Sequence, residues 1–228
     1  MLALAALVAS CSASSGSGGA LVASSSSSSG PTAEGSSGTD GVAACEAIRT
    51  GPWTAVPSSA DLVDLARTAK LPRIPVADIP APVVTMDDDF TTIESYLAPS
   101  NVPDKAARAQ VMADAGYRGG TDVTYLQDPQ EHGAKVQRFR DAAGALAYLR
   151  AHLTNVCPRA VTTVELPDHA GLVYRDPVDA VRAIFVLGDS EVDLLVCGCI
   201  PGDQVAIATA WYQRLAHELG SGPAKEIR

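Results

Sequence analysis

Apolar residues recur at spacings of three and four through the front of the folded part of the chain, and this period predicts helices. The first expected helix takes Ser58 as its N-cap and ends before the prolines that begin at Pro72. A second begins at Asp87–Asp89, whose carboxylates suit a helix N-terminus, and a third opens at Pro103 and closes at Gly116. We therefore expect a helical front segment that is interrupted by proline.

From residue 121 onward the apolar runs become short and rich in β-branched residues, which is typical of strands. The expected strands cover residues 121–126, 135–139, 161–166 and 171–174. Two further apolar runs flank Gly188–Ser190 and predict a hairpin at the centre of the sheet. One helix capped by Asp141 and a last helix from Asp203 to Leu219 complete the pattern. The elements predict an α+β fold, in which an antiparallel sheet carries helices packed mainly on one face and follows the helical, proline-rich segment.

The first residues of the chain follow a different pattern, because an apolar run from Leu2 to Ala9 stops at Cys11. The run is too short to span a bilayer, which takes about 20 residues, but it suits the core of an export signal. Leu7–Cys11 resembles the lipobox of bacterial lipoproteins, in which apolar and then small residues precede an acylated cysteine. The resemblance implies that residues 1–10 are a signal peptide and that Cys11 carries the lipid. A chance cysteine behind an apolar tail is the competing interpretation.

No basic residue precedes Arg49, although a signal peptide normally begins with one, so we expect the natural signal to start further upstream. Behind Cys11, 12 of the 26 residues from Ser12 to Ser37 are serine and five are glycine. Such a segment buries too little apolar surface to fold, which predicts a linker over residues 11–41. One extracytoplasmic domain over residues 42–220 and a tail over 221–228 follow it.

The charge pattern excludes one class of partner, since the chain carries 17 basic and 26 acidic residues and no cluster of Lys or Arg exceeds two neighbours. A nucleic-acid surface is therefore not expected. The four histidines lie at positions 132, 152, 169 and 217, and none is four residues from another, as a zinc helix would require. The carboxylates at Asp87–Asp89 lack the alternating spacing of a calcium loop, and residues 188–192 lack the G-x-S-x-G of a serine hydrolase. We expect no catalytic set, metal or cofactor.

Two stretches, AGYRGGTDVTYL and VQRFRDAAGALAYLRAHL, resemble segments of uncharacterised actinobacterial lipoproteins of the mycobacterial or nocardial type. A looser resemblance connects the chain to the extracytoplasmic sensor domains of mycobacterial receptor kinases, which are disulfide-linked α/β domains. Both resemblances imply a fold class and a place on the outer side of the cell membrane. The expected function is a lipid-anchored module that binds or senses a small ligand or an envelope protein. A thiol–disulfide enzyme that uses Cys197 and Cys199 and a purely structural envelope protein are the alternatives.

Four cysteines remain besides Cys11, namely Cys45, Cys157, Cys197 and Cys199, an even number in a chain that its signal directs to an oxidising compartment. They predict two structural disulfides. Cys197 and Cys199 are two residues apart on an expected strand, which places their Cα atoms about 6.6 Å apart and disfavours a bond between them. Each is therefore expected to pair with Cys45 or Cys157, in either combination.

Overall fold

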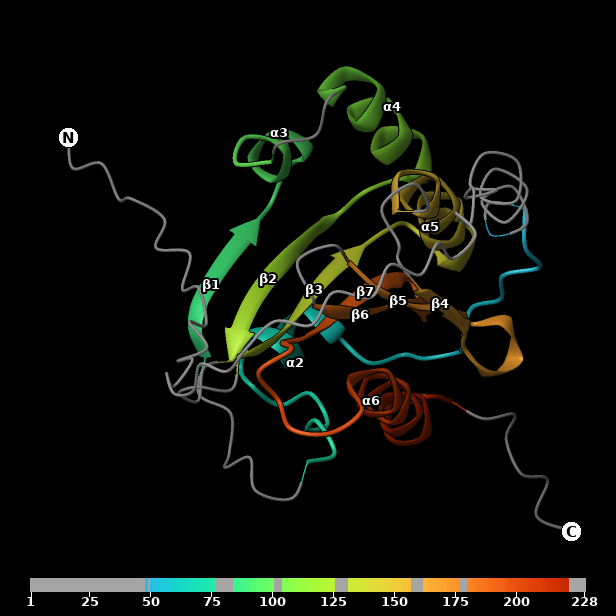
Figure 1. Ribbon diagram of the computed structural model, residues 1–228. Helices are drawn as coiled ribbons and strands as arrows, with labels where there is room; N and C mark the ends of the chain where they lie inside the picture. The colour runs from blue at the N-terminus through green and yellow to red at the C-terminus, as the bar shows by residue number, and fades with distance from the viewer. Residues whose placement is uncertain are drawn as a thin grey trace, which may run out of the picture. The chain divides into compact units, whose positions relative to one another are not determined.

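Within the described part of the chain, seven antiparallel strands form one continuous sheet in the order β1-β2-β3-β7-β6-β5-β4 (Figure 1). The computed structural model describes residues 48, 50–76, 84–100, 104–125, 131–156, 162–176 and 180–221. The strands are β1 (Val84–Phe90), β2 (Gly119–Tyr125), β3 (His132–Arg138), β4 (Thr162–Glu165), β5 (Gly171–Arg175), β6 (Val181–Leu187) and β7 (Ser190–Val196). The β6–β7 hairpin turns at Gly188 and places β7 fourth in the order, so the prediction that this hairpin occupies the centre of the sheet is confirmed.

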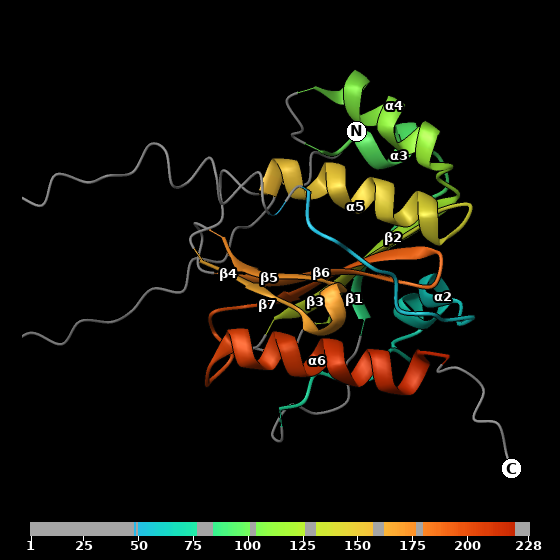
Figure 2. The ribbon, with the colours of Figure 1, turned by 90° about the vertical axis from the view of Figure 1, so that its right-hand side faces the viewer.

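Helices cover both faces of the sheet, as Figure 2 shows. One face carries α3 (Ile93–Leu97), α4 (Lys105–Ala115) and α5 (Ala142–Val156), and the other carries α2 (Leu62–Arg67) and α6 (Gln204–Leu219). Strand β6 is apolar on both sides for this reason: Ile184 and Val186 pack under α5, while Phe185 and Leu187 belong to the core with α6. None of the described helices combines the length and the apolar character that a membrane span requires.

The predicted α+β class and antiparallel sheet are confirmed, and so are the helix ends that local chemistry defines. The Asp141 carboxylate accepts a hydrogen bond from the Gly144 amide at 2.8 Å, and Asp203 accepts from the amide of Val205 at 3.0 Å. Gly116 ends α4 in the left-handed conformation, with φ of 74°. The prediction that the helices pack mainly on one face is wrong: α2 and α6 cover the second face, because β5 and β6 present apolar residues on both sides.

Two local predictions are wrong. Asp87–Asp89 do not begin a helix but lie in β1, because this segment pairs with β2 residue by residue, Asp88 opposite Asp122 and Phe90 opposite Gly120. Helix α3 begins later, behind a capping box in which Thr92 and Ser95 bond each other's backbone amides. The first helix is capped by Asp61 rather than Ser58, whose hydroxyl instead donates to the carbonyl of Leu219 at the end of α6.

Candidate functional site

Side chains of alternating charge cross the middle of the sheet on the face that α3, α4 and α5 cover. Asp122 of β2, Lys135 of β3 and Asp193 of β7 stand opposite one another in register, so their side chains share this face. Lys135 Nζ lies 2.7 Å from Asp122 Oδ2, and Arg182 of β6 donates through Nη1 to Asp193 Oδ2 at 2.8 Å. We call these four residues the charge ladder.

The ladder keeps both of its cations charged. The nearby Asp193 carboxylate raises the pKa of Arg182 above its usual range and outweighs the opposite effect of burial. Burial acts to lower the pKa of Lys135, but Tyr96 and the Asp122 carboxylate more than compensate, so the pKa is raised. The Lys135 ammonium also lies over the Tyr96 ring, 5.3 Å from its centroid. The ladder is therefore a set of paired charges within the fold.

A hydrogen-bonded network of uncharged and acidic groups lies next to the ladder, two residues away along β3 and β7. Gln137 and Glu191 stand opposite each other on β3 and β7. Glu191 Oε1 lies 2.6 Å from Nδ1 of His152 on α5, and Gln137 Nε2 donates to the hydroxyl of Tyr96 on α3 at 3.0 Å. The Tyr96 hydroxyl lies 3.4 Å from that of Tyr148 on α5. The network therefore connects the sheet to α3 and α5.

Three acceptor oxygens of this layer are buried and have no hydrogen-bond partner among the described residues: Gln137 Oε1, Glu191 Oε2 and Asp193 Oδ1. The side chains belong to two neighbouring strands and one face of the sheet. Buried polar atoms are paired in the great majority of cases, so three unused acceptors in one place are unusual. They identify this face as the polar part of the molecule's interior.

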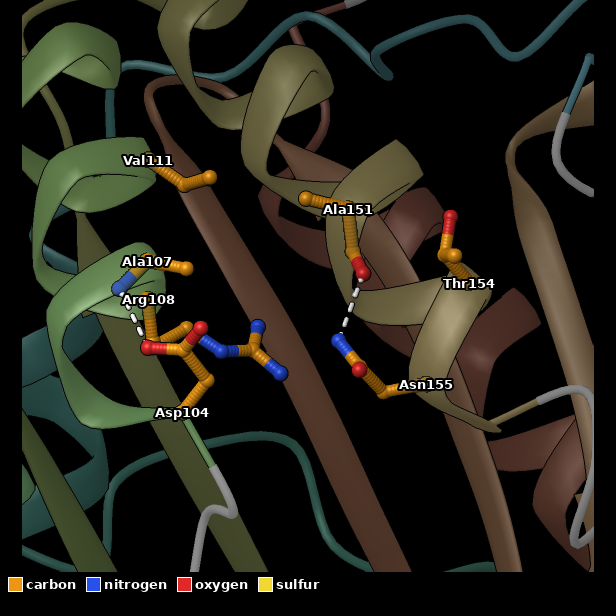
Figure 3. Close-up of a pocket in the computed structure, with 7 residues that line it drawn as sticks. All are labelled: Asp104, Ala107, Arg108, Val111, Ala151, Thr154 and Asn155. Atoms are coloured by element: carbon orange, nitrogen blue, oxygen red, sulfur yellow. Dashed lines mark hydrogen bonds between the residues drawn. The ribbon is translucent and has the colours of Figure 1, made fainter.

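A groove of about 320 Å³ lies between α4 and α5 (Figure 3). It is lined by Asp104, Ala107, Arg108, Val111, Ala151, Thr154 and Asn155. The polar groups from α5 are committed to their own helix, since the Thr154 hydroxyl donates to the Arg150 carbonyl and the Asn155 amide to that of Ala151, both at 2.9 Å. The Asp104 carboxylate caps α4 by accepting from the amide of Ala107, also at 2.9 Å.

Arg108 is the cationic group of the groove and has a buried donor without a partner among the described residues. Figure 3 shows its side chain reaching from α4 into the space between the two helices. Its Nη1 is buried and has no partner among the described residues, and the guanidinium lies over the Tyr148 ring at 5.4 Å from the centroid. Burial raises the pKa of Tyr148 well above its usual range, so the phenol stays neutral. The groove thus offers apolar walls and one cation.

The cysteine pairing expected for Cys197 and Cys199 is wrong, because these two residues form a disulfide with each other. Strand β7 ends at Val196, and the segment Cys197–Cys199 turns instead of continuing the strand. The turn brings the two Cα atoms to 5.1 Å, within the ordinary range for a disulfide, whereas a strand would hold them further apart. Cys11, Cys45 and Cys157, the other cysteines assigned a role, lie outside the described residues.

The histidines are distributed over separate sites. His132 is buried between the rings of Tyr125 and Trp211, His152 belongs to the network, and His169 contacts Glu165 at the surface. No group of three His, Cys, Asp or Glu side chains within the described ranges is arranged to hold a metal ion.

Sequence reasoning missed Arg108, Tyr148 and the charge ladder. One signal was present: Glu191 and Asp193 alternate with apolar residues in a strand predicted to lie at the centre of the sheet. Acidic residues on one face of a central strand are expected to be buried, and buried carboxylates require partners. No comparable signal marks Arg108.

No family model, curated protein or solved structure matches the chain. The structure itself therefore defines the class: an α+β domain with a seven-stranded antiparallel sheet, a layer of polar side chains on one face, and a groove between two helices above that face.

Proposed function

We propose that the protein is a membrane-anchored extracytoplasmic lipoprotein whose domain binds a small ligand in the groove between α4 and α5. The observation that carries the proposal is the groove itself, which combines mostly apolar walls with the Arg108 guanidinium. Its volume of about 320 Å³ falls at the lower end of the range of about 300–1,000 Å³ typical of ligand sites. Such sites are predominantly apolar and carry a few polar groups that orient the ligand.

The location rests on the lipobox resemblance at Leu7–Cys11 and on the serine- and glycine-rich segment behind it. The 34 residue steps from Cys11 to Cys45 can extend over at most about 110 Å. This length lets the domain work at a distance from the membrane surface. One acyl chain holds a protein only marginally, so the proposal requires the several chains of a lipoprotein anchor.

The anchor is tested by expressing the chain behind a basic signal start in an actinobacterium and comparing wild type with Cys11→Ala. We expect the wild type in the membrane fraction, with an N-terminal peptide that begins at Cys11 and carries acyl groups by mass spectrometry. Cys11→Ala should appear in the medium or remain as precursor. An unmodified Cys11 in membrane-bound protein would refute the anchor.

The groove is tested with N-phenyl-1-naphthylamine, a neutral dye whose fluorescence rises in apolar surroundings. Ala151→Trp fills the groove, whereas Ala147→Trp places the same indole one turn earlier on α5 at an exposed position outside the lining. We expect dye binding by the wild type and Ala147→Trp and its loss in Ala151→Trp. Equal binding by all three proteins, or none by the wild type, would contradict the proposed site.

The Cys197–Cys199 bond favours a second candidate function, thiol–disulfide exchange. A disulfide that closes so short a loop contributes roughly 1.6 kcal/mol in the chain-entropy model, against about 3 kcal/mol for a 15-residue loop, so stabilisation is a weak reason for it. The Cys199 amide also donates to the Cys197 sulfur at 3.1 Å, a contact that favours a thiolate there after cleavage.

In this second function, a thiolate of a dithiol substrate attacks Cys199 Sγ, the Sγ–Sγ bond breaks, and Cys197 leaves as a thiolate. The second substrate thiol then displaces Cys199 from the mixed disulfide, so the substrate is oxidised and the protein reduced. Reduced protein should conversely cleave the disulfides of insulin, and Cys197→Ser should not. An inactive wild type with a disulfide that resists mild reductant would remove this candidate.

A further inference from the structure

We propose that the ligand of the groove is a small amphiphilic anion, with a carboxylate or phosphate head held by Arg108 and an apolar body between Ala107, Val111 and Ala151. The inference rests on the proposed binding function and names the chemical class of the ligand. Three features of the groove support it: the unpaired Nη1 of Arg108, the chemistry of the walls, and the absence of the buried acceptors from the lining.

The Arg108 guanidinium is a cation without a counter-ion among the described residues. Its Nη1 is buried without an acceptor, and a buried donor of a charged group is unfavourable unless it is paired. The single acidic residue of the groove, Asp104, caps α4 and forms no ion pair with Arg108 among the contacts of the described residues. A guanidinium presents parallel N–H groups that match the two oxygens of a carboxylate or phosphate. An anionic head therefore completes the groove.

The walls determine the rest of the ligand. Ala107 and Val111 of α4 face Ala151 of α5 across the groove, while the Thr154 hydroxyl and the Asn155 side-chain nitrogen donate within their own helix. An extended apolar body fits between such walls and gains from burial. The volume of about 320 Å³ suits a ligand on the order of ten heavy atoms rather than a diacyl lipid.

A cationic ligand is the main competitor, because Gln137, Glu191 and Asp193 present unused acceptors nearby. These residues are 0%, 1% and 4% exposed, and none lines the groove. A ligand in the groove meets Arg108 first. The net charge of −9 repels anions at long range, but salt screens this effect beyond about 8–10 Å. The contact with Arg108 therefore decides the sign of the ligand's charge.

The test compares probes built on an unbranched ten-carbon chain: decanoate, decyl phosphate, decanol and decyltrimethylammonium, each displacing N-phenyl-1-naphthylamine below its micelle concentration. We expect the two anions to displace the dye at concentrations about tenfold or more below those of decanol, as a charged hydrogen bond predicts. Acetate and inorganic phosphate, which lack the tail, should displace it poorly. Arg108→Gln should abolish the advantage of the anions, and Arg108→Lys should retain part of it.

The outcomes separate the two proposals. Equal displacement by decanol and decanoate in the wild type would overturn the anionic ligand while leaving the groove as a binding site. Preference for decyltrimethylammonium would overturn it in favour of a cation. Failure of the wild type to bind the dye, the result that contradicts the groove, would overturn both. The probe comparison in the wild type does not depend on how any variant folds, and circular dichroism shows whether Arg108→Gln is folded.

Discussion

Removing one cation from the charge ladder should destabilise the fold more than removing the whole pair. Arg182→Met leaves the Asp193 carboxylate, whose side chain is 5% exposed, without the guanidinium that donates to it at 2.8 Å. Breaking a buried ion pair by removing one partner costs about 3–5 kcal/mol. Lys135 stands opposite Asp193 and compensates part of the charge, and Arg182 is 31% exposed, so we expect the lower end, about 3 kcal/mol.

The double variant Arg182→Met with Asp193→Leu removes both charges and places apolar side chains beside Ile184. Replacing a buried pair by apolar residues of similar volume is often neutral, so its free energy of unfolding should lie within about 1 kcal/mol of wild type. The double variant should therefore be about 2 kcal/mol more stable than Arg182→Met alone. Arg140→Met is the control, because Arg140 pairs with Asp141 at the surface and such pairs contribute about 0–1 kcal/mol.

Urea unfolding followed by tryptophan fluorescence measures these free energies, since Trp53 and Trp211 are both buried. A loss of about 3 kcal/mol should lower the melting temperature by about 6–12 °C in a domain of this size. An Arg182→Met protein no less stable than Arg140→Met would refute the reasoning. A double variant as unstable as Arg182→Met would do so as well, because the cost would then lie in packing rather than in an unpaired charge.

Three further predictions concern the helices. Gly144→Ala should destabilise the fold in urea unfolding, because the added Cβ would overlap a backbone oxygen at the end of α4. We expect this although alanine is more favourable than glycine in a helix by about 1 kcal/mol. Ala147→Gly is the control at an exposed position of α5. The Gly144 amide donates to the Asp141 carboxylate and lowers its pKa, so this cap stabilises the fold above about pH 4 and its contribution is lost as pH falls through the lowered pKa. Between about pH 6 and pH 3, the urea midpoint of Asp141→Asn should therefore fall less than that of wild type. Trp211→Phe should lose about 1–3 kcal/mol in the same assay, because the indole donates to the buried Pro72 carbonyl at 2.7 Å.

Local chemistry in the sequence was sufficient to predict most elements and their ends. Asp141 and Asp203 begin helices because a carboxylate there satisfies amides of the first turn, and that requires only neighbouring residues. Gly116 and Gly188 adopt positive φ, which glycine tolerates without strain, and they end a helix and turn a hairpin as predicted. These features follow from contacts within a few residues along the chain.

Pairing between distant segments decided the rest. Asp87–Asp89 form a strand because β2 supplies their backbone partners, and Cys197 leaves β7 because its neighbouring strands pair only as far as Val196. The ladder exists because register sets Lys135 between Asp122 and Asp193. Each carboxylate was visible as an alternating position in the sequence, but its partner was not. Arg108 lies over the Tyr148 ring, 40 residues further along the chain, only because α4 packs beside α5. No local sequence pattern encodes this contact.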